Sequence, residues 1–266
     1  MPSVRVFSAS WSHYGVCAEL ALAMKGVPAT VVPVPYHDKT ELLAATGQDY
    51  LPALVWDGTV VPWTDIAPFL ETKVPSPTLY PNGNRGIPTV LERWGHQVLE
   101  EKVWRAVVTR MPPTFADEKE RWVFEEIQRR VRGPWEVLEL RREEFLADLA
   151  EELAWVDAAL EGRDWLLGAP SLADCGVYGG LSSMRVAGEP IPSKFGNLTR
   201  WVERVEGLRA TGPAPTAARP RESGGIAGTA TPATRRARET VRRDRRYVMP
   251  AVGLGPKVAS PHARSL

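Results

Sequence analysis

The sequence predicts an α/β domain, then an all-helical domain, then a C-terminal tail without a fold. In the first 75 residues, short apolar runs typical of strands alternate with helical periodicity. Beyond a proline-rich stretch, every periodic segment is helical. The last 57 residues hold 13 Gly or Pro and one aromatic residue, a composition that cannot offset the entropy of ordering the chain. We therefore expect domains at residues 1–75 and 89–209, a linker at 76–88 and a disordered Arg/Ala/Pro/Gly-rich tail at 210–266.

Composition places the chain among ordinary soluble globular proteins. Of its 266 residues, 44% are hydrophobic and 24% are charged, and no apolar run approaches the roughly 20 residues that span a bilayer. The first residues lack the basic and apolar stretches of a secretory signal, so we expect a cytoplasmic protein with no membrane partner. Cys17 and Cys175 are far apart in sequence, which predicts neither a disulfide framework nor a metal site. Both are expected in the core.

The first domain is predicted to be a small mixed sheet with helices on its faces. Val16, Leu20 and Met24 recur at four-residue spacing, which indicates a helix. Asp57-Gly58 between two apolar runs is a strong hairpin signal. The expected elements, in order, are a strand at 4–7, a helix at 13–25, a strand at 29–35, a short helix at 39–46, paired strands at 53–56 and 59–61, and a helix at 64–71.

The second domain is predicted to be a set of packed helices. An apolar residue recurs every three or four positions from Leu146 to Leu160, which lines one face of a helix. Ser171 and Asp174 have the spacing of a capping box, in which each side chain bonds the backbone of the other residue. Loss of Asp174 should therefore damage folding more than substrate affinity. Further helices are expected at 90–110, 118–132 and 197–208.

Charge is divided unevenly between the domains and the tail. The tail holds 11 Lys or Arg against 3 Asp or Glu, whereas the preceding residues hold 22 against 29. The arginine clusters at 235–238 and 242–246 could attract nucleic acid or another acidic surface. They lack the interleaved aromatic residues of single-strand binding proteins. A solvated extension is the favoured interpretation, and nucleic acid is not expected as a partner.

Several separated segments, in order, resemble one protein family. Residues 7–27 resemble the strand, active-site turn and first helix of serine-type glutathione S-transferases, and residues 51–58 resemble their strand after a cis-proline. Residues 64–71 resemble the helix that ends the first domain, and residues 169–174 resemble the capping box of the helical domain. The resemblance covers about residues 3–208. It implies a thioredoxin-like N-terminal domain, a helical-bundle C-terminal domain and glutathione as a thiol co-substrate.

Ser12 matches the position of the family's catalytic serine. Conjugation requires a thiolate, because a protonated thiol is a poor nucleophile and an unperturbed thiol has a pKa of about 8.5. Where the loop enters the first helix, the Ser12 hydroxyl and the free backbone amides could both donate to a sulfur anion. The alternative is that Ser12 only caps the helix, a position that serine favours. Redox members of the family carry a cysteine at this place, so the dithiol exchange that they perform has no nucleophile here.

Four residues are expected at the thiol-cofactor site, namely Leu51, Pro52, Trp63 and Thr64. The resemblance implies a cis Leu51-Pro52 bond that turns the Leu51 backbone toward the cysteinyl part of glutathione, the alternative being an ordinary trans proline before a strand. The family holds the γ-glutamyl carboxylate with an acidic residue or Gln followed by Ser or Thr. Pro62 and Trp63 occupy those places here, or Trp63 and Thr64 if the register slips by one residue. In either register the anchor is altered.

Five residues are expected at the electrophile pocket by the same resemblance. Trp11, His13 and Tyr14 adjoin Ser12 in sequence, and His13 could also act as an acid or base near neutral pH. Trp104 and Arg105 lie on the long helix that faces the pocket in the family. The alternative for each is a packing or surface role, because tryptophan at helical spacing is more often core than binding site.

The sequence thus predicts a glutathione S-transferase-like enzyme of the detoxification type. It would attach a thiol, expected to be glutathione, to small hydrophobic electrophiles, with Ser12 stabilising the thiolate and no metal involved. The family resemblance implies a homodimer. The alternative is a non-catalytic, transferase-like binding or interaction module with an altered thiol site, and Pro62-Trp63 is the feature that favours it.

Overall fold

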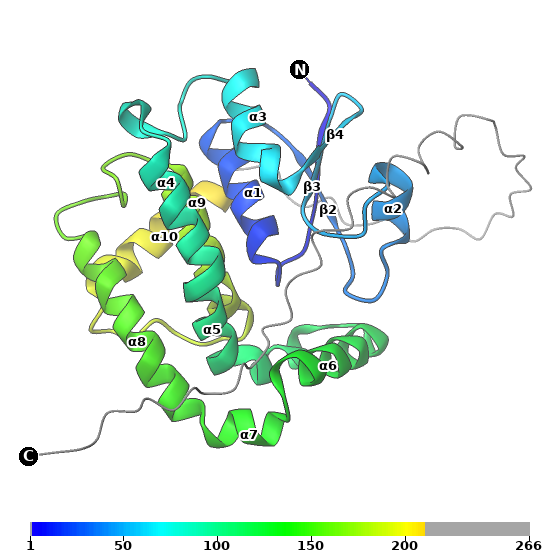
Figure 1. Cartoon of the computed structure of the whole chain (residues 1–266), viewed down its shortest axis with the longest axis vertical. Coiled ribbons are helices and arrows are strands. Elements are labelled where there is room, and N and C mark those ends of the chain that lie inside the picture. Colours follow the sequence, from blue (N-terminus) through cyan, green and yellow to red (C-terminus); the bar gives the residue numbers. More distant parts are fainter. Residues whose placement is uncertain (1, 211–266) are drawn as a thin grey trace, which may run out of the picture. The chain divides into compact units, whose positions relative to one another are not determined.

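The computed structural model describes residues 2–210, which lie within one compact unit, Met1–Ala218 (Figure 1). Met1 and residues 211–266 lie outside the described residues. The predicted tail therefore lies outside them too, apart from Ala210, which is the last residue of a helix.

The N-terminal domain is built on a four-stranded mixed sheet. Its strands lie in the order β2(Thr30–Pro33), β1(Val4–Ser8), β3(Ala53–Trp56), β4(Thr59–Pro62). β1 pairs with β2 in parallel, and the other two pairs are antiparallel. The Asp57-Gly58 turn, with φ of 47° and 82°, closes the predicted hairpin between β3 and β4. This is the thioredoxin-like sheet that the sequence predicts.

Helices cover both faces of this sheet. α1(His13–Met24) and α3(Ile66–Lys73) lie on one face, and α2(Thr40–Thr46) lies on the other (Figure 1). Successive residues of a strand point to opposite faces, so Leu54 joins the cluster shared with α1 and α3, whereas Phe7 packs in the smaller cluster on the α2 side.

The C-terminal domain is entirely helical within the described residues. Its helices are α4(Gly86–Trp94), α5(Glu100–Val107), α6(Glu118–Arg132), α7(Trp135–Leu140), α8(Arg142–Ala159), α9(Leu172–Val186) and α10(Gly196–Ala210). The helices predicted at 118–132, along Leu146–Leu160 and after Ser171 are confirmed.

Two details of this domain differ from the prediction. The helix expected at 90–110 begins earlier, at Gly86, and is divided by a π-helical turn, η3(Gly95–Leu99), which joins α4 to α5. It also ends earlier, because Val108–Arg110 forms a separate 3-10 turn. The short helix α7 was not predicted, because it has only six residues. It follows Gly133, at a φ of 95°, and Pro134, which mark the end of α6.

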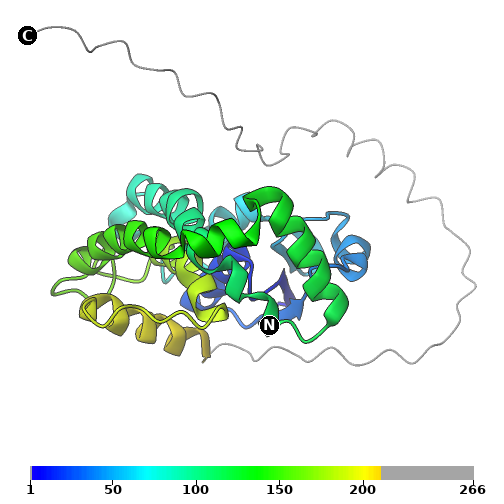
Figure 2. The ribbon, with the colours of Figure 1, turned by 90° about the horizontal axis from the view of Figure 1, so that it is seen from below.

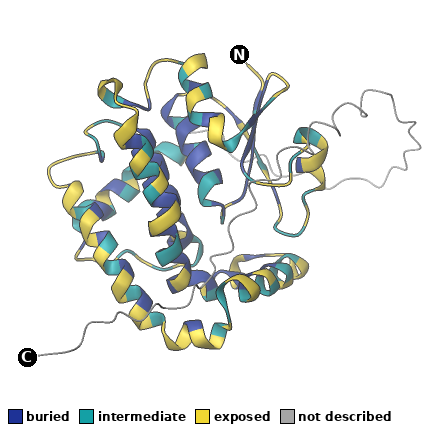
Figure 3. Ribbon diagram, in the orientation of Figure 1, coloured by how far each residue is buried: buried dark blue, intermediate teal, exposed yellow. Residues whose placement is uncertain are grey.

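α9 is the innermost helix of the described structure. Of its 15 residues, all from Leu172 to Met184 are buried, and it packs on α1, α4 and α5. Figure 3 shows the buried residues gathered on the sheet, α1 and the inward sides of the helices. Gly176 and Gly180 lie against the backbone of α4 and of Gly95, so closely that a Cβ at Gly180 would overlap the Gly95 carbonyl oxygen. Glycine is therefore what allows these helices to approach at backbone distance.

None of the helices in residues 2–210 has the length and apolar character needed to cross a bilayer.

Candidate functional site

Ser12 occupies the N-cap of α1. After β1 the chain turns at residues 9–12, and the extended backbone of Ser12, with φ of −89° and ψ of 103°, leads into the helix. Its Oγ accepts a hydrogen bond from the Gly15 N–H at 3.2 Å, and the residue is only 7% exposed. Ser12 therefore caps α1, as the capping interpretation predicts. Because the hydroxyl acts as acceptor in this bond, its own hydrogen stays available to donate.

The proline expected at the cofactor site lies beside this turn. Phe7 pairs with Ala53 in the antiparallel β1–β3 ladder, so residues 51–52 run alongside residues 8–9. The Leu51-Pro52 peptide bond is cis, as the sequence analysis predicted. Pro52 is buried, Leu51 is half-buried, and the Pro52 carbonyl accepts a hydrogen bond from Gln48 Nε2 at 3.3 Å.

Trp11 and Trp104 belong to a single row of packed rings. Trp11 lies edge-on to Tyr36 with ring centroids 4.6 Å apart, and Tyr36 contacts Phe124 of α6 at 5.1 Å. Phe124, which is fully buried, lies 6.0 Å from Trp104. Tyr36 and Phe124 thus fill the space between the two tryptophans. Neither of these two residues was identified from the sequence, because they come from segments 88 positions apart.

α6 is held against the N-terminal domain by hydrogen bonds as well as by rings. The Tyr36 N–H donates to Glu120 Oε1 at 2.6 Å, and Gln128 Nε2 donates to the Tyr36 hydroxyl oxygen at 2.9 Å. Figure 2 shows α6, in green, beside the sheet, in blue. The loop between β2 and α2 is therefore fixed by the helical domain.

Arg105 does not join the other predicted pocket residues. Its side chain is half exposed and its Nε donates to Glu101 Oε1, one turn earlier on the same helix, at 3.0 Å. The cation that does contact Trp104 is Arg132, whose guanidinium carbon lies 4.8 Å from the ring centroid. Trp104 and Arg105 therefore lie in different surroundings, because neighbouring residues of a helix point about 100° apart.

His13, Tyr14 and Trp63 form a second aromatic group together with His96, a residue of η3. Tyr14 lies 4.4 Å from Trp63 and 4.1 Å from His96, measured between ring centroids, and His13 lies 5.0 Å from His96. His13 Nδ1 also lies 3.3 Å from Glu100 Oε1. Trp63 thus packs on the Tyr14 ring. The sequence offered no signal for His96.

Thr64 is exposed in the 3-10 turn η1(Trp63–Asp65), which precedes α3. Its hydroxyl donates to Asp65 Oδ1 at 3.2 Å, and no side-chain hydrogen bond caps α3. The structure therefore separates Thr64 from Trp63: one faces solvent and the other packs inward on Tyr14.

Burial sets the electrostatics of the second aromatic group. It raises the pKa of the Tyr14 hydroxyl to about 12, with the charges of Glu92 and Glu100 adding to the effect. Burial likewise raises the pKa of Glu92 to about 7. The pKa of His96 is lowered well below its usual value, first by burial and then by His13. Near neutral pH, His96 is therefore an uncharged imidazole.

A cavity of about 370 Å³ lies on another side of the Ser12 turn. Ser10 and Val16, which flank Ser12 in sequence, form part of its wall, together with residues of α9 and α10. Two cations, Arg185 and Arg209, also line it, and both are paired with carboxylates. None of the predicted pocket residues is among those lining this cavity in the described part of the chain. The sequence analysis missed it because its walls come from four distant segments.

Comparison with protein families identifies both halves of the described structure. Residues 6–78 match the family described as glutathione S-transferase, N-terminal domain, and residues 139–204 match glutathione S-transferase, C-terminal domain. The two matches together span just over half of the 266 residues. A comparison of the sequence with curated proteins finds no match.

Solved structures with the same fold come from diverse organisms. Glutathione transferase GSTFuA3 of Phanerochaete chrysosporium is 18% identical with a TM-score of 0.66, over 77% of this chain and 97% of that one. Glutaredoxin 2 of Salmonella typhimurium, solved in complex with glutathione, is 15% identical with a TM-score of 0.64, over 79% and 95%. A glutathione S-transferase of Rhodospirillum rubrum is 22% identical with a TM-score of 0.58, over 76% and 87%. At these identities the similarity establishes the fold.

Proposed function

Because the chain belongs to the glutathione S-transferase family, we propose that it binds glutathione and conjugates its thiol to small hydrophobic electrophiles. The observation that carries the proposal is the position of Ser12 at the N-cap of α1. The hydroxyl hydrogen and the first-turn amides can both stabilise a sulfur anion there, and the helix dipole adds to them. Together these contributions are worth about 1–3 kcal/mol, or one to two units of thiol pKa.

The packing around Ser12 favours one location for the electrophile. The side between Trp11 and Trp104 is filled by Tyr36 and Phe124. The cavity beside Ser10 is open and has apolar as well as polar walls, so we propose that the electrophile binds there. We also propose that the enzyme acts in the cytoplasm, as a homodimer and in detoxification, as the family resemblance implies.

Replacement of Ser12 tests the catalytic proposal. Ser12→Ala should lower kcat/KM for conjugation of glutathione to an aromatic halide about 10- to 100-fold, because a charge-assisted hydrogen bond contributes about 1.5–3 kcal/mol. The pKa of the bound thiol should rise by about one to two units. Both quantities are measurable, by initial rates and by the ultraviolet absorbance of the thiolate against pH.

A second variant separates catalysis from helix capping. Replacing an N-cap serine with alanine lowers stability by about 0.5–2 kcal/mol. Ser12→Asp avoids this loss because its carboxylate oxygen can cap α1, but it has no hydroxyl and it repels a thiolate. It should be as stable as the wild type and as inactive as Ser12→Ala. Wild-type rates in Ser12→Asp would remove Ser12 from the mechanism.

The contact between Tyr14 and Trp63 favours a second candidate function, a non-catalytic binding module. The γ-glutamyl group, which carries an ammonium as well as a carboxylate, would find an indole where the family supplies an acidic residue or Gln and a hydroxyl. Glutathione would then bind weakly or not at all, and the fold would serve another ligand or partner. Retention on a glutathione column without turnover would favour this function over the first.

Restoring the family's anchor distinguishes these two functions. The double change Pro62→Glu with Trp63→Ser should tighten glutathione binding at least about tenfold if the missing anchor limits affinity, since one charge-assisted hydrogen bond is worth about 1.5–3 kcal/mol. Isothermal titration calorimetry measures the glutathione affinity of each variant. Thr64→Ala, a change at an exposed neighbour, is the matched control and should leave the affinity unaltered. An equal affinity in the double variant and the wild type would mean that the natural site does not depend on this anchor.

A further inference from the structure

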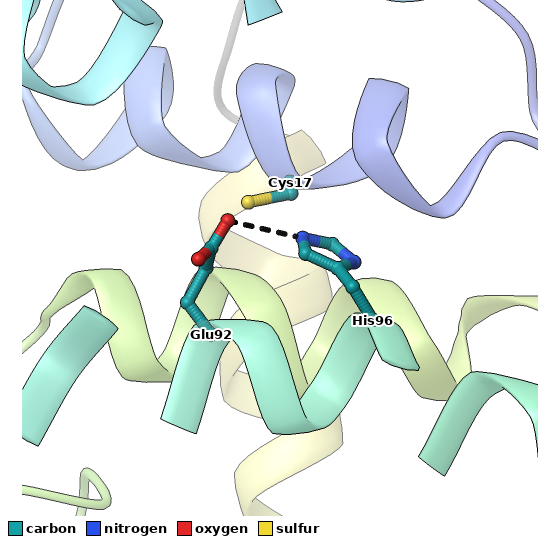
Figure 4. Close-up of side chains that lie close together, drawn as sticks. All are labelled: Cys17, Glu92 and His96. Carbon is teal, nitrogen blue, oxygen red and sulfur yellow. Dashed lines mark ion pairs between the residues drawn. The ribbon is translucent and has the colours of Figure 1, made fainter. Parts of the chain in front are cut away.

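Three side chains with metal-ligating atoms converge between the two domains. Cys17 points from α1 toward α4, and Glu92 and His96 point back from α4 and η3 (Figure 4). One thiol sulfur, one carboxylate oxygen and one imidazole nitrogen all lie within 4.8 Å of one another. Glu92 Oε1 and His96 Nε2 are 3.5 Å apart. None of these residues belongs to the proposed thiol site.

His96 is a buried member of the trio that lacks hydrogen-bond partners among the described residues. Its side chain is 1% exposed, yet within residues 2–210 neither ring nitrogen forms a hydrogen bond. A buried imidazole normally has a partner for at least one nitrogen, because an unpaired buried polar atom carries the full cost of its lost hydration. An uncharged imidazole nitrogen is also the form that binds metals. His96 Nε2 thus accepts no hydrogen bond within residues 2–210 and lies 3.5 Å from Glu92 Oε1.

α9 packs closely against the trio at Gly179. A Cβ at this position would come to 2.7 Å from the His13 carbonyl oxygen and 3.2 Å from His96 Cε1. Glycine therefore allows α9 to approach His96 this closely. The thiol of Cys175, which is fully buried, lies 3.5 Å from Met24 Sδ and also contacts the Cys17 thiol. Cys17 is the sulfur that groups with Glu92 and His96.

We propose that Cys17, Glu92 and His96 bind a zinc ion that joins α1 of the N-terminal domain to α4 and η3 of the C-terminal domain. Sulfur, nitrogen and oxygen donors in one set suit Zn²⁺, which forms tetrahedral sites with bonds of about 2.0–2.3 Å. Three protein ligands leave the fourth position for water. Side-chain rotations that shorten the present separations by about 1 Å bring the donors to such a geometry.

Charge favours this ion in a largely buried place. A thiolate and a carboxylate neutralise the two positive charges of Zn²⁺, so the complex has no net charge to desolvate. Glu92 retains partial exposure, with 15% of its side chain accessible, which provides a route for the ion. On binding, the thiol proton is released to solvent, as is the carboxyl proton where Glu92 carries one. No oxidant or reductant is involved.

Metal titration of the full chain tests the site. After treatment with a chelator, the protein should bind one equivalent of Zn²⁺, measured by calorimetry, and its melting temperature should rise with added metal. Cd²⁺ as a probe should give the ultraviolet charge-transfer band of a thiolate ligand. Cys17→Ser should abolish this band. His96→Gln should weaken Zn²⁺ binding by at least about 100-fold, because losing even a residue that only hydrogen-bonds a ligand costs up to about 100-fold in metal affinity.

A matched control separates this site from other donors. His37→Gln removes a histidine outside the trio, and this variant should bind Zn²⁺ and Cd²⁺ as the wild type does. Circular dichroism of each metal-free variant verifies that it is folded. Absence of one-equivalent binding by the wild type would overturn the proposal, and so would unchanged binding in folded Cys17→Ser and His96→Gln. None of these measurements involves glutathione, so they are independent of the proposed enzymatic function.

Discussion

Asp174→Ala is expected to lower the free energy of unfolding by about 3–5 kcal/mol, the cost of breaking a buried charge-assisted network. Asp174 is fully buried and accepts four hydrogen bonds. Ser171 donates from its N–H at 3.0 Å and from its hydroxyl at 2.7 Å. The other carboxylate oxygen accepts from the Leu166 N–H at 3.0 Å and from Trp201 Nε1 at 2.9 Å. Alanine would leave all these donors without an acceptor.

Chemical denaturation followed by circular dichroism measures this loss. Asp148→Ala is the matched control, because Asp148 is 47% exposed and its one described ion pair, with Lys102, is at the surface. It should change the free energy of unfolding by less than about 1 kcal/mol. If Asp174→Ala were no less stable than Asp148→Ala, the network would contribute nothing and the capping box would not define the start of α9.

Gly180→Ala is expected to destabilise the protein by about 3 kcal/mol, although alanine is the better helix former. A Cβ at this position would overlap the carbonyl oxygen of Gly95. Overpacking a core costs about 1–3 kcal/mol when side chains can move aside, and a backbone carbonyl cannot do so without displacing η3. The gain in helix propensity, about 1 kcal/mol, offsets only part of the cost.

Gly207→Ala makes the same chemical change at a helical glycine but is not expected to destabilise the protein. Gly207 also lies within a helix, α10, but a Cβ there would meet no atom of residues 2–210 within 4 Å. This variant should be as stable as the wild type or more stable by up to about 1 kcal/mol. Thermal or denaturant unfolding of the pair gives the comparison, and equal effects at the two positions would show that the contact between α9 and η3 is not tight.

The fold was predictable because its elements carry local signals. The four-residue spacing of α1, the Asp57-Gly58 turn and the Ser171–Asp174 capping box each fix an element or its boundary from a few neighbouring residues. The interruption of the predicted helix at 90–110 has no such signal, because the π-helical turn at Gly95 arises where two helices pack at backbone distance. That contact is a tertiary effect, with Gly176 and Gly180 more than 80 positions away in sequence.

The candidate site was predictable only in part. Ser12 and the cis bond before Pro52 lie where the sequence places them, since both depend on the strand and turn around them. The ring partners of Trp11 and Tyr14 could not be foreseen, because they come from segments distant in sequence. Trp11 contacts Tyr36, and Tyr14 contacts Trp63 and His96. The same holds for Cys17, whose neighbours in space are unrelated to its neighbours in sequence.

The tight packing of α9 has a consequence for how the protein melts. α1 is at once a cover for the sheet and the surface on which the innermost helix of the other domain rests. Separating the halves would expose apolar residues of both domains that now share one buried cluster. We therefore expect the two domains to unfold together in a single transition.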